Sequence, residues 1–212
     1  IGQPMWDIIV VLRAKNFPSP GTTLRNARID LQAGGAAANV ASGVAALGGK
    51  SVFVGKFSND FLDREYINEL LARGVNVIAL KAEEARIGLC VSLVLEFAER
   101  SFLVDAGVGN MLSCDDINLV ASTIEESRFL YISGFDVTRQ GQERAYLKAM
   151  DIAHSSGVKI FFDPADREMI LKRYKLIWDI VKASDIICLN HMELKALTSI
   201  NNDIKRSIEC LN

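Results

Sequence analysis

The chain has 212 residues, of which 50% are hydrophobic and 24% are charged, and its formal net charge is −2. This length and composition suit one fairly large globular domain, and the lack of a basic block argues against a nucleic-acid partner. The longest apolar runs, such as "DIIVVL" and "SLVLEF", are too short to span a bilayer, which argues against a membrane protein.

Short apolar runs alternate with helical patterns along the chain. Runs rich in Val, Ile and Phe predict strands buried on both faces, at Asp7–Leu12, Lys50–Gly55, Val75–Leu80, Arg128–Ser133, Val158–Asp163 and Asp185–Asn190. Helical patterns lie between them, at Ala36–Leu47, Asp60–Arg73, Gln140–Ser156 and about Leu171–Ala183. Repeated β-α units of this kind predict an α/β fold in which a parallel sheet has helices on both faces.

Two stretches interrupt this alternation, "TTLRNARIDLQAGG" at Thr22–Gly35 and "IGLCVSLVLEFAERSFLVDAG" at Ile87–Gly107. Both look like strands without intervening helices, and "NARIDLQ" alternates polar and apolar residues. They predict a small separate sheet with strands within about residues 8–33 and 86–105. A lid over a ligand site and an oligomer interface are both open uses for such a sheet.

The glycine-rich stretch "AGGAAANVASGVAALGGKS", Ala33–Ser51, contains a near match to the phosphate-binding G-x-x-x-x-G-K-S loop. The match fails, because the spacing requires glycine where Val44 stands. Its context fails too, since Gly48 and Gly49 close a helix, whereas a P-loop opens one. No G-x-G-x-x-G motif opens a helix after a strand either, so a dinucleotide fingerprint is absent.

The start of this helix has two open interpretations. Gly34 and Gly35 allow backbone to approach a ligand closely, the helix start offers free N–H donors, and Asn39 supplies an amide suited to sugar hydroxyls. Alternatively, the small residues pack the helix tightly against the sheet. Asp7 is similarly open: it is a carboxylate for two vicinal hydroxyls or an ordinary carboxylate at a strand edge.

Four cysteines, Cys90, Cys114, Cys188 and Cys210, lie far apart without C-x-x-C pairing. This spacing argues against a zinc site and a disulfide framework. It favours reduced thiols and therefore a cytoplasmic protein.

Several motifs occur in an order that resembles the ribokinase-like (PfkB) carbohydrate kinases. They are G-x-x-x-x-D at Gly2–Asp7, "FPSPGTT", "GGAAANVASGVAALGG", "VGKFSNDF…LLARGVNV", "SGF" at Ser133–Phe135, "FFDPADR" at Phe162–Arg167 and "SDIICLNHMELKALT". The resemblance extends over essentially the whole chain. Two departures are that "DFLDRE" lacks a glycine usual after Asp60, and that Ala165 replaces the asparagine of the family's DPNxR motif.

The resemblance implies a three-layer α-β-α domain over residues 1–212 with a small β-sheet lid, which holds a sugar between lid and main sheet. It implies that Asp7, Gly34, Gly35 and Asn39 contact substrate hydroxyls. Arg167 is then expected near the substrate or its phosphate, beside Asp163. A small-molecule sugar or nucleoside is the implied partner, and a homodimer through the lid is a further expectation.

Asn190 and Glu193 resemble the family's N-x-x-E motif, which implies a role toward nucleotide phosphates and, indirectly through Glu193, toward Mg²⁺. The same pair reads as a capping box, with Asn190 as N-cap and Glu193 three positions later. Both roles are compatible, so the alternatives stay open.

The implied reaction is Mg²⁺-assisted phosphoryl transfer from ATP to a sugar hydroxyl. The family's catalytic base and most ATP contacts belong to a "GAGD"-type motif in the carboxyl-terminal third, and residues 1–212 contain none. We therefore expect this stretch to correspond to the amino-terminal two thirds of a kinase and to be inactive alone, with no catalytic base among its residues.

Three functions remain open on this basis. The first is a kinase for a sugar or sugar acid, such as 2-keto-3-deoxygluconate, fructose or ribose. The second is a nucleoside kinase of the adenosine type, and the third is a non-catalytic sugar-binding module.

Overall fold

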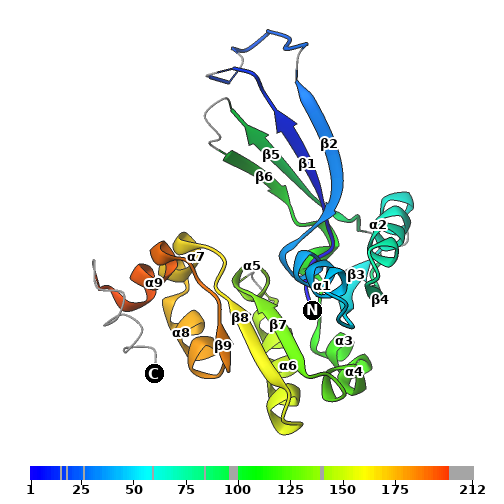
Figure 1. Ribbon diagram of the computed structural model, residues 1–212, viewed down its shortest axis with the longest axis vertical. Coiled ribbons are helices and arrows are strands. Elements are labelled where there is room, and N and C mark those ends of the chain that lie inside the picture. The colour runs from blue at the N-terminus through cyan, green and yellow to red at the C-terminus, as the bar shows by residue number, and fades with distance from the viewer. Residues whose placement is uncertain are drawn as a thin grey trace. The chain divides into compact units, whose positions relative to one another are not determined.

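The computed structural model describes residues 1–14, 16–17, 19–25, 27–58, 60–83, 85–95, 100–138 and 141–200 (Figure 1). The chain divides into two compact units. One unit is Gln3–Gly109, and the other consists of Ile1–Gly2 and Asn110–Asn212. Each unit has its own sheets and its own buried core.

The first unit contains a mixed sheet, here called the lid sheet, with the strand order β2-β1-β5-β6 (Figure 1). Its strands are β1 (Met5–Val11), β2 (Arg28–Gly34), β5 (Gly88–Val94) and β6 (Arg100–Asp105). Strand β1 pairs antiparallel with β2 and parallel with β5, and β5 pairs antiparallel with β6. Strands β2, β5 and β6 come from the two segments that were expected to form a separate small sheet.

The assignment of the run Asp7–Leu12 to the buried parallel sheet was wrong, because β1 pairs along its whole length with β2 and β5. From Asp7 to Val11 the residues of β1 are only half-buried. The run is continuously apolar because one face of the lid sheet is almost wholly apolar and the other is mixed. The sequence of β1 therefore lacks the alternation of polar and apolar residues that identifies a strand with one exposed face.

The rest of the first unit is an α-β-α-β arrangement around a parallel pair, β3 (Val52–Phe57) and β4 (Asn76–Lys81). Helix α1 (Ala36–Ala46) precedes β3, and α2 (Phe61–Ala72) connects the two strands. Tyr66 of α2 is fully buried and packs against the rings of Trp6, Phe53 and Phe57. This aromatic cluster fastens α2 to both the parallel pair and β1.

The second unit has a parallel sheet in the order β7-β8-β9, from β7 (Phe129–Ser133), β8 (Lys159–Asp163) and β9 (Ile186–Ile187). Its helices are α3 (Cys114–Leu119), α4 (Ala121–Glu125), α5 (Gly134–Val137), α6 (Glu143–Ser155), α7 (Arg167–Lys172), α8 (Tyr174–Lys182) and α9 (His191–Thr198). A 3₁₀ turn, η1 (Gly107–Asn110), lies at the boundary between the units. Helix α6 begins at Glu143, later than predicted, and the predicted start at Gln140 lies outside the described residues.

Sequence signals for helix ends are confirmed where a glycine follows. Gly74 after α2 and Gly157 after α6 have φ values of 82° and 73°, which glycine adopts without strain. The single helix predicted at Leu171–Ala183 is wrong, because α7 and α8 are separate and meet at Arg173. The guanidinium of Arg173 pairs with Glu143 of α6, which holds the chain at the break.

None of the helices in the described part of the chain is both long and apolar enough to cross a bilayer. Cys90, Cys114 and Cys188 are free thiols, and Cys210 lies outside the described residues.

Candidate functional site

The structure brings Asp7 of β1 directly over Gly34 at the end of β2. A Cβ atom built on Gly34 would lie 2.1 Å from Oδ2 of Asp7 and 2.8 Å from Oδ1. Only glycine leaves room for the Asp7 carboxylate at this place. The first two sequence-predicted site residues are therefore immediate neighbours.

The carboxylate of Asp7 forms no hydrogen bond or ion pair with any residue that the structure describes, although Asp7 is only half-exposed. Burial alone raises its pKa above the ordinary value of 3.8. The pKa of the neighbouring Cys90 thiol is also raised, chiefly by burial and in addition by the negative charge of Asp7. A carboxylate that is partly desolvated without a partner is costly for the fold, which is typical of groups that bind a ligand.

Side chains from α2 hold the end of β2 in place. The Tyr66 hydroxyl donates to the carbonyl of Gly34 at 2.7 Å. The Ala33 amide donates to Glu69 at 3.2 Å, and Arg73 donates to the Ala33 carbonyl at 3.1 Å while pairing with Glu69. The backbone beneath Asp7 is thus held by side chains of α2 and of the residue that follows it.

Gly35 turns the chain from β2 into α1 with φ 90° and ψ 138°. A Cβ on Gly35 would lie 2.6 Å from the carbonyl oxygen of Gln3, so glycine is required by both conformation and space. Helix α1 has no side-chain N-cap, and its first N–H groups have no intrahelical acceptor. These donors follow directly after the glycine under the Asp7 carboxylate.

Asn39 lies in the first turn of α1 and is exposed. Its backbone N–H donates to Gly35, and its side-chain amide makes no hydrogen bond with the described residues. The structure thus brings Asp7 and Gly34 together, and Gly35 and Asn39 follow in the turn into α1 and in its first turn.

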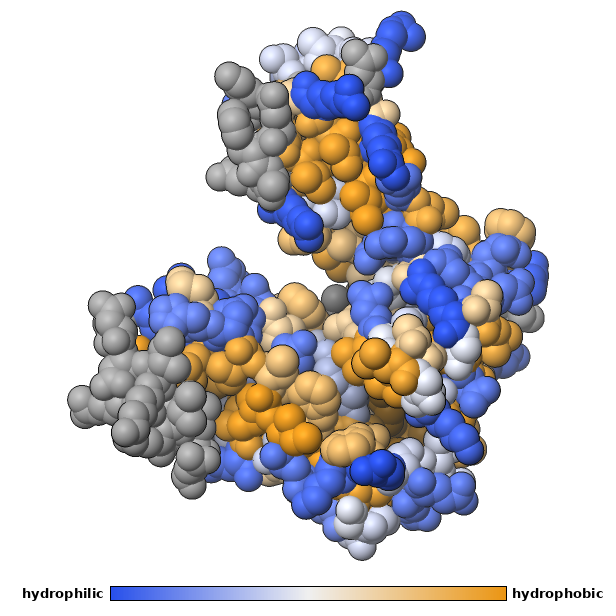
Figure 2. Space-filling model, in the orientation of Figure 1, coloured by the Kyte–Doolittle hydropathy of each residue, from blue (hydrophilic) through white to orange (hydrophobic). Residues whose placement is uncertain are grey.

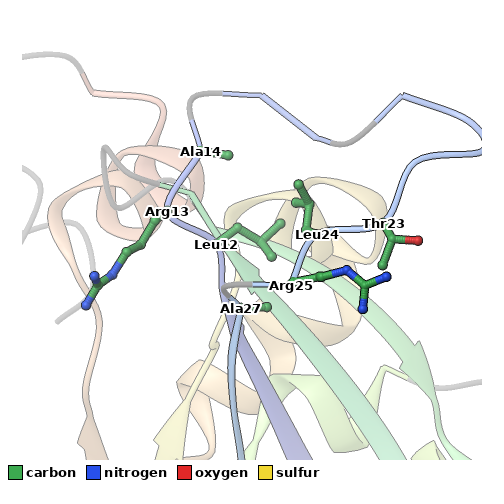
Figure 3. Close-up of a pocket in the computed structure, with 7 residues that line it drawn as sticks. All are labelled: Leu12, Arg13, Ala14, Thr23, Leu24, Arg25 and Ala27. Atoms are coloured by element: carbon green, nitrogen blue, oxygen red, sulfur yellow. The ribbon is translucent and has the colours of Figure 1, made fainter.

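A shallow pocket of ≈ 310 Å³ lies elsewhere, at the tip of the lid sheet, and is lined by Leu12, Arg13, Ala14, Thr23, Leu24, Arg25 and Ala27 (Figure 3). The two arginine side chains point away from each other. Leu12 lies five residues after Asp7 along an extended chain, roughly 17 Å away. The pocket is therefore not part of the Asp7 site.

The second group of predicted residues lies at the carboxyl ends of β8 and β9 in the other unit. Asp163 ends β8, and its carboxylate accepts from the Tyr131 hydroxyl at 3.1 Å and from the Ala165 amide at 2.9 Å. Burial, and after it the Asp163 charge, raises the pKa of Tyr131, so this phenol stays protonated as a donor. Asp163 thus shapes the turn after β8.

Two of the motifs noted in the sequence pack directly on each other. A Cβ on Gly134, in "SGF", would lie 2.1 Å from the carbonyl oxygen of Pro164, in "DPADR". Ser133 caps α5 by accepting from the Phe135 amide at 3.2 Å. Glycine at position 134 lets the loops after β7 and β8 approach closely.

Ala165 stands in the left-handed region with φ 68°, a conformation that asparagine adopts more easily than alanine. We expect Ala165→Asn to raise the free energy of unfolding by about 0.5–1 kcal/mol, since left-handed backbone costs alanine about 1–2 kcal/mol. Urea denaturation measures the change. Ala36→Asn, at a helical position of α1, should lower stability instead, and a loss at position 165 would contradict the strain argument.

Arg167 is the first residue of α7 and is exposed, without an ion pair among the described residues. Asn190 follows β9 and begins α9. Because β8 and β9 are parallel neighbours, Asp163 and Asn190 lie at the same edge of their sheet, where open α/β sheets place ligands.

Asn190 and Glu193 form a complete capping box. Asn190 accepts at Oδ1 from the amides of Met192 and Glu193, at 2.8 and 3.0 Å. Glu193 accepts at Oε2 from the Asn190 amide at 2.8 Å and at Oε1 from the Asn190 side chain at 2.5 Å. Glu193 is only 5% exposed, and each of its two carboxylate oxygens accepts a hydrogen bond from Asn190.

A capping role predicts a small effect for Glu193→Gln, because the amide retains one acceptor oxygen of two. We expect a loss of less than about 1 kcal/mol in the free energy of unfolding and an unchanged Mg²⁺ dependence of activity. The matched control is Glu168→Gln, on the exposed surface of α7. An altered Mg²⁺ titration curve for Glu193→Gln alone would assign this carboxylate a role toward metal or phosphate.

A Mg²⁺ ion in phosphoryl transfer is usually held by one or two carboxylates together with the nucleotide phosphates. Among the described residues no three His, Cys, Asp or Glu side chains come together in a metal-binding group. Glu193, the one residue predicted to act toward the metal, is occupied by Asn190. No chemical step on this chain is therefore assigned to the metal.

The sequence alone missed the neighbours of Asp7 across the lid sheet. Gln32 of β2 and Cys90 of β5 stand directly opposite Asp7 in the strand register, so all three side chains share one face. Register between strands is not visible in a single sequence. The one available signal was the position of Gln32 two residues before Gly34, which places both on the same face.

Comparison with known proteins agrees with this arrangement of motifs. Fructokinase-2 of Solanum lycopersicum is 30% identical over 178 residues, which are 79% of this chain and 53% of that protein. Ribokinase of Mus musculus is 26% identical over 201 residues, 93% of this chain and 58% of that protein. The chain spans about half the length of the curated relatives it matches.

The fold is shared with solved structures. The crystal structure of adenosine kinase from Sinorhizobium meliloti matches 99% of this chain and 69% of that one, with a TM-score of 0.85 and 22% identity. The predicted ribokinase-like α/β fold with mostly parallel strands is confirmed. The model of the pfkB family carbohydrate kinases matches residues 1–212, and the chain therefore belongs to this family.

Proposed function

We propose that the protein containing this chain phosphorylates a hydroxyl group of a sugar or sugar acid, with ATP as the phosphoryl donor. The observation that carries the proposal is the half-buried Asp7 carboxylate, which lies against Gly34 and has no protein partner among the described residues. A carboxylate only accepts hydrogen bonds, and two neighbouring hydroxyls of a sugar can donate to its two oxygens.

Each residue of the proposed site has one task. Asp7 accepts from the substrate hydroxyls and fixes their orientation. Gly34 makes room for the Asp7 carboxylate, and Gly35 turns the chain into α1, whose first N–H groups donate to the substrate. The amide of Asn39 adds a donor and an acceptor. ATP supplies the transferred phosphoryl group, and we place its contacts near the Asn190–Glu193 capping box. We place Arg167 near the substrate or the phosphate region.

The relatives favour fructose or ribose as acceptor, because fructokinase and ribokinase are the names of the similar sequences. A sugar acid such as 2-keto-3-deoxygluconate has the same hydroxyl chemistry. Residues 1–212 would form one ribokinase-like domain with the lid sheet over its sugar site. Since we expect no catalytic base among them, these residues alone would not turn over substrate. Their smaller role would be to bind a sugar.

A nucleoside is the second candidate. The register places Phe102 of β6 on the same face of the lid sheet as Asp7, and 58% of this residue is exposed. An exposed aromatic ring can stack on a nucleobase while Asp7 holds the ribose hydroxyls. Adenosine kinase is the function named for a protein of the same fold.

An acceptor screen tests the proposal. ADP formation is measured for the full-length protein with Mg²⁺-ATP and fructose, ribose, 2-keto-3-deoxygluconate or adenosine, and without acceptor. We expect acceptor-dependent ADP with a sugar or sugar acid. Stimulation by adenosine alone would favour the nucleoside kinase, and an acceptor that binds without stimulating ADP formation would leave only a sugar-binding module.

We also propose that the lid sheet joins two copies of the chain. Its face opposite Asp7 is formed almost wholly by apolar side chains, several of them exposed, and Figure 2 shows apolar residues gathered over these strands. They are Ile8, Val10, Ile29, Leu31, Val91, Leu93 and Leu103. A patch of this kind is typical of an interface, and a self-complementary sheet face suits a second copy.

Leu31→Glu on this face tests the dimer. It should shift the protein from dimer to monomer in analytical ultracentrifugation, because the charge would be buried without a partner. Gln32→Glu on the other face should remain dimeric, and a wild-type monomer would contradict the interface. The reduced thiols of the described cysteines favour a cytoplasmic location for this assembly.

A further inference from the structure

The row of side chains that crosses the lid sheet at Asp7 contains a second free polar group. Gln32 stands directly opposite Asp7 in the β1–β2 pair, and Cys90 stands opposite Asp7 on the other side. Directly opposed residues have Cβ atoms about 4.5–5.5 Å apart on the same face. Gln32 and Asp7 therefore stand next to each other on one face of the lid sheet.

Gln32 differs from the other members of the row. Cys90 is 9% exposed, whereas Gln32 is exposed, and its carboxamide makes no hydrogen bond with the described residues. The Asp7 carboxylate lies toward Gly34, which is two residues beyond Gln32 on β2 and on the same face. Neither polar group uses the other as its partner, so both remain available to one ligand.

The chemistry of the two groups is complementary. A carboxylate accepts hydrogen bonds only, whereas a carboxamide both donates and accepts. A substrate hydroxyl that donates to Asp7 has its vicinal hydroxyl on the adjoining carbon, within the spacing of two opposed side chains. Nε2 of Gln32 can donate to that second hydroxyl, or Oε1 can accept from it.

We propose that Gln32 is a specificity-determining residue of the acceptor site, which recognises the hydroxyl adjacent to the one held by Asp7. This inference rests on the proposed function, because it assumes that Asp7 binds an acceptor hydroxyl. Gln32 selects acceptors that have vicinal hydroxyls at this place and disfavours those in which the second hydroxyl is missing.

The test uses the full-length protein and whichever acceptor of fructose, ribose and adenosine supports the fastest wild-type turnover, together with its single-deoxy analogues. Gln32→Leu removes the polar group and keeps much of the volume. We expect it to raise KM for the parent acceptor about 2- to 12-fold, the range for one neutral hydrogen bond, with kcat little changed. One deoxy analogue should show the same KM with wild type and variant.

Arg28→Gln is the matched control, since Arg28 lies on the same strand and face but pairs with Asp30 at the exposed end of the sheet. Its KM values should equal those of wild type. An unchanged KM for Gln32→Leu with the parent acceptor, or an equal rise for the parent and every deoxy analogue, would overturn the assignment while the proposed function stands. Absence of wild-type turnover with every acceptor would instead reject the proposed function and this inference with it.

Discussion

Asp7→Asn should weaken acceptor binding by about 1–3 kcal/mol, which is roughly a 5- to 150-fold rise in KM. The amide is similar in size, but it replaces one accepting oxygen with a donor and removes the charge that strengthens both hydrogen bonds. Steady-state kinetics of the full-length protein measure the effect. A variant with wild-type KM and kcat would show that the carboxylate over Gly34 does not bind the acceptor.

The same substitution should leave the fold as stable as before or more stable. Burial raises the pKa of Asp7 above its unfolded value, so its contribution to stability is fully present below the unfolded pKa and is lost as the pH rises through the folded pKa. At neutral pH the ionised carboxylate is therefore a burden that Asp7→Asn removes. Asp30→Asn, in the exposed Arg28–Asp30 pair of the same sheet, is the control and should change neither quantity.

Replacing glycine by alanine should have opposite effects on the free energy of unfolding at Gly35, just before α1, and at Gly43, inside it. Gly35→Ala should lower the free energy of unfolding by about 2–4 kcal/mol, because a positive φ costs alanine about 1–3 kcal/mol and an overpacked contact costs a similar amount. The new Cβ would lie 2.6 Å from the Gln3 carbonyl oxygen, a backbone atom that cannot rotate away as a side chain could.

Gly43→Ala should instead raise the free energy of unfolding by about 0.5–1 kcal/mol. Gly43 lies inside α1, is exposed, and a Cβ there would meet no atom within 4 Å. Urea denaturation of both variants gives the two values. Equal stability of Gly35→Ala and wild type would mean that the turn into α1 is not fixed by Gly35 and that the backbone under Asp7 can shift.

The β-α alternation of the fold was readable in the sequence, because strands such as β4 and β8 are short runs that follow helices with closing glycines. The pairing of β1 was not. Its run reads as a strand buried on both faces, but the strand pairs in the lid sheet, where one face is apolar and the other includes Asp7. The break between α7 and α8 was also hidden, because Arg173 is held by Glu143, which lies 30 residues earlier.

The sequence predicted which residues form the candidate site, but it predicted only part of their arrangement in space. Two adjacent glycines before a helix indicated close backbone approach at Gly34 and Gly35, but nothing in the sequence paired Gly34 with Asp7. That contact depends on the antiparallel register of β1 and β2, as does the place of Gln32. The cap formed by Asn190 and Glu193 was visible because all of its partners lie within four residues.

A crystal structure of the full-length protein with its acceptor bound tests the central claim most directly. The account predicts acceptor hydroxyl oxygens within about 2.5–3.0 Å of the Asp7 carboxylate, above Gly34 and Gly35. An acceptor bound elsewhere, with Asp7 hydrogen-bonded only to protein groups, would contradict it.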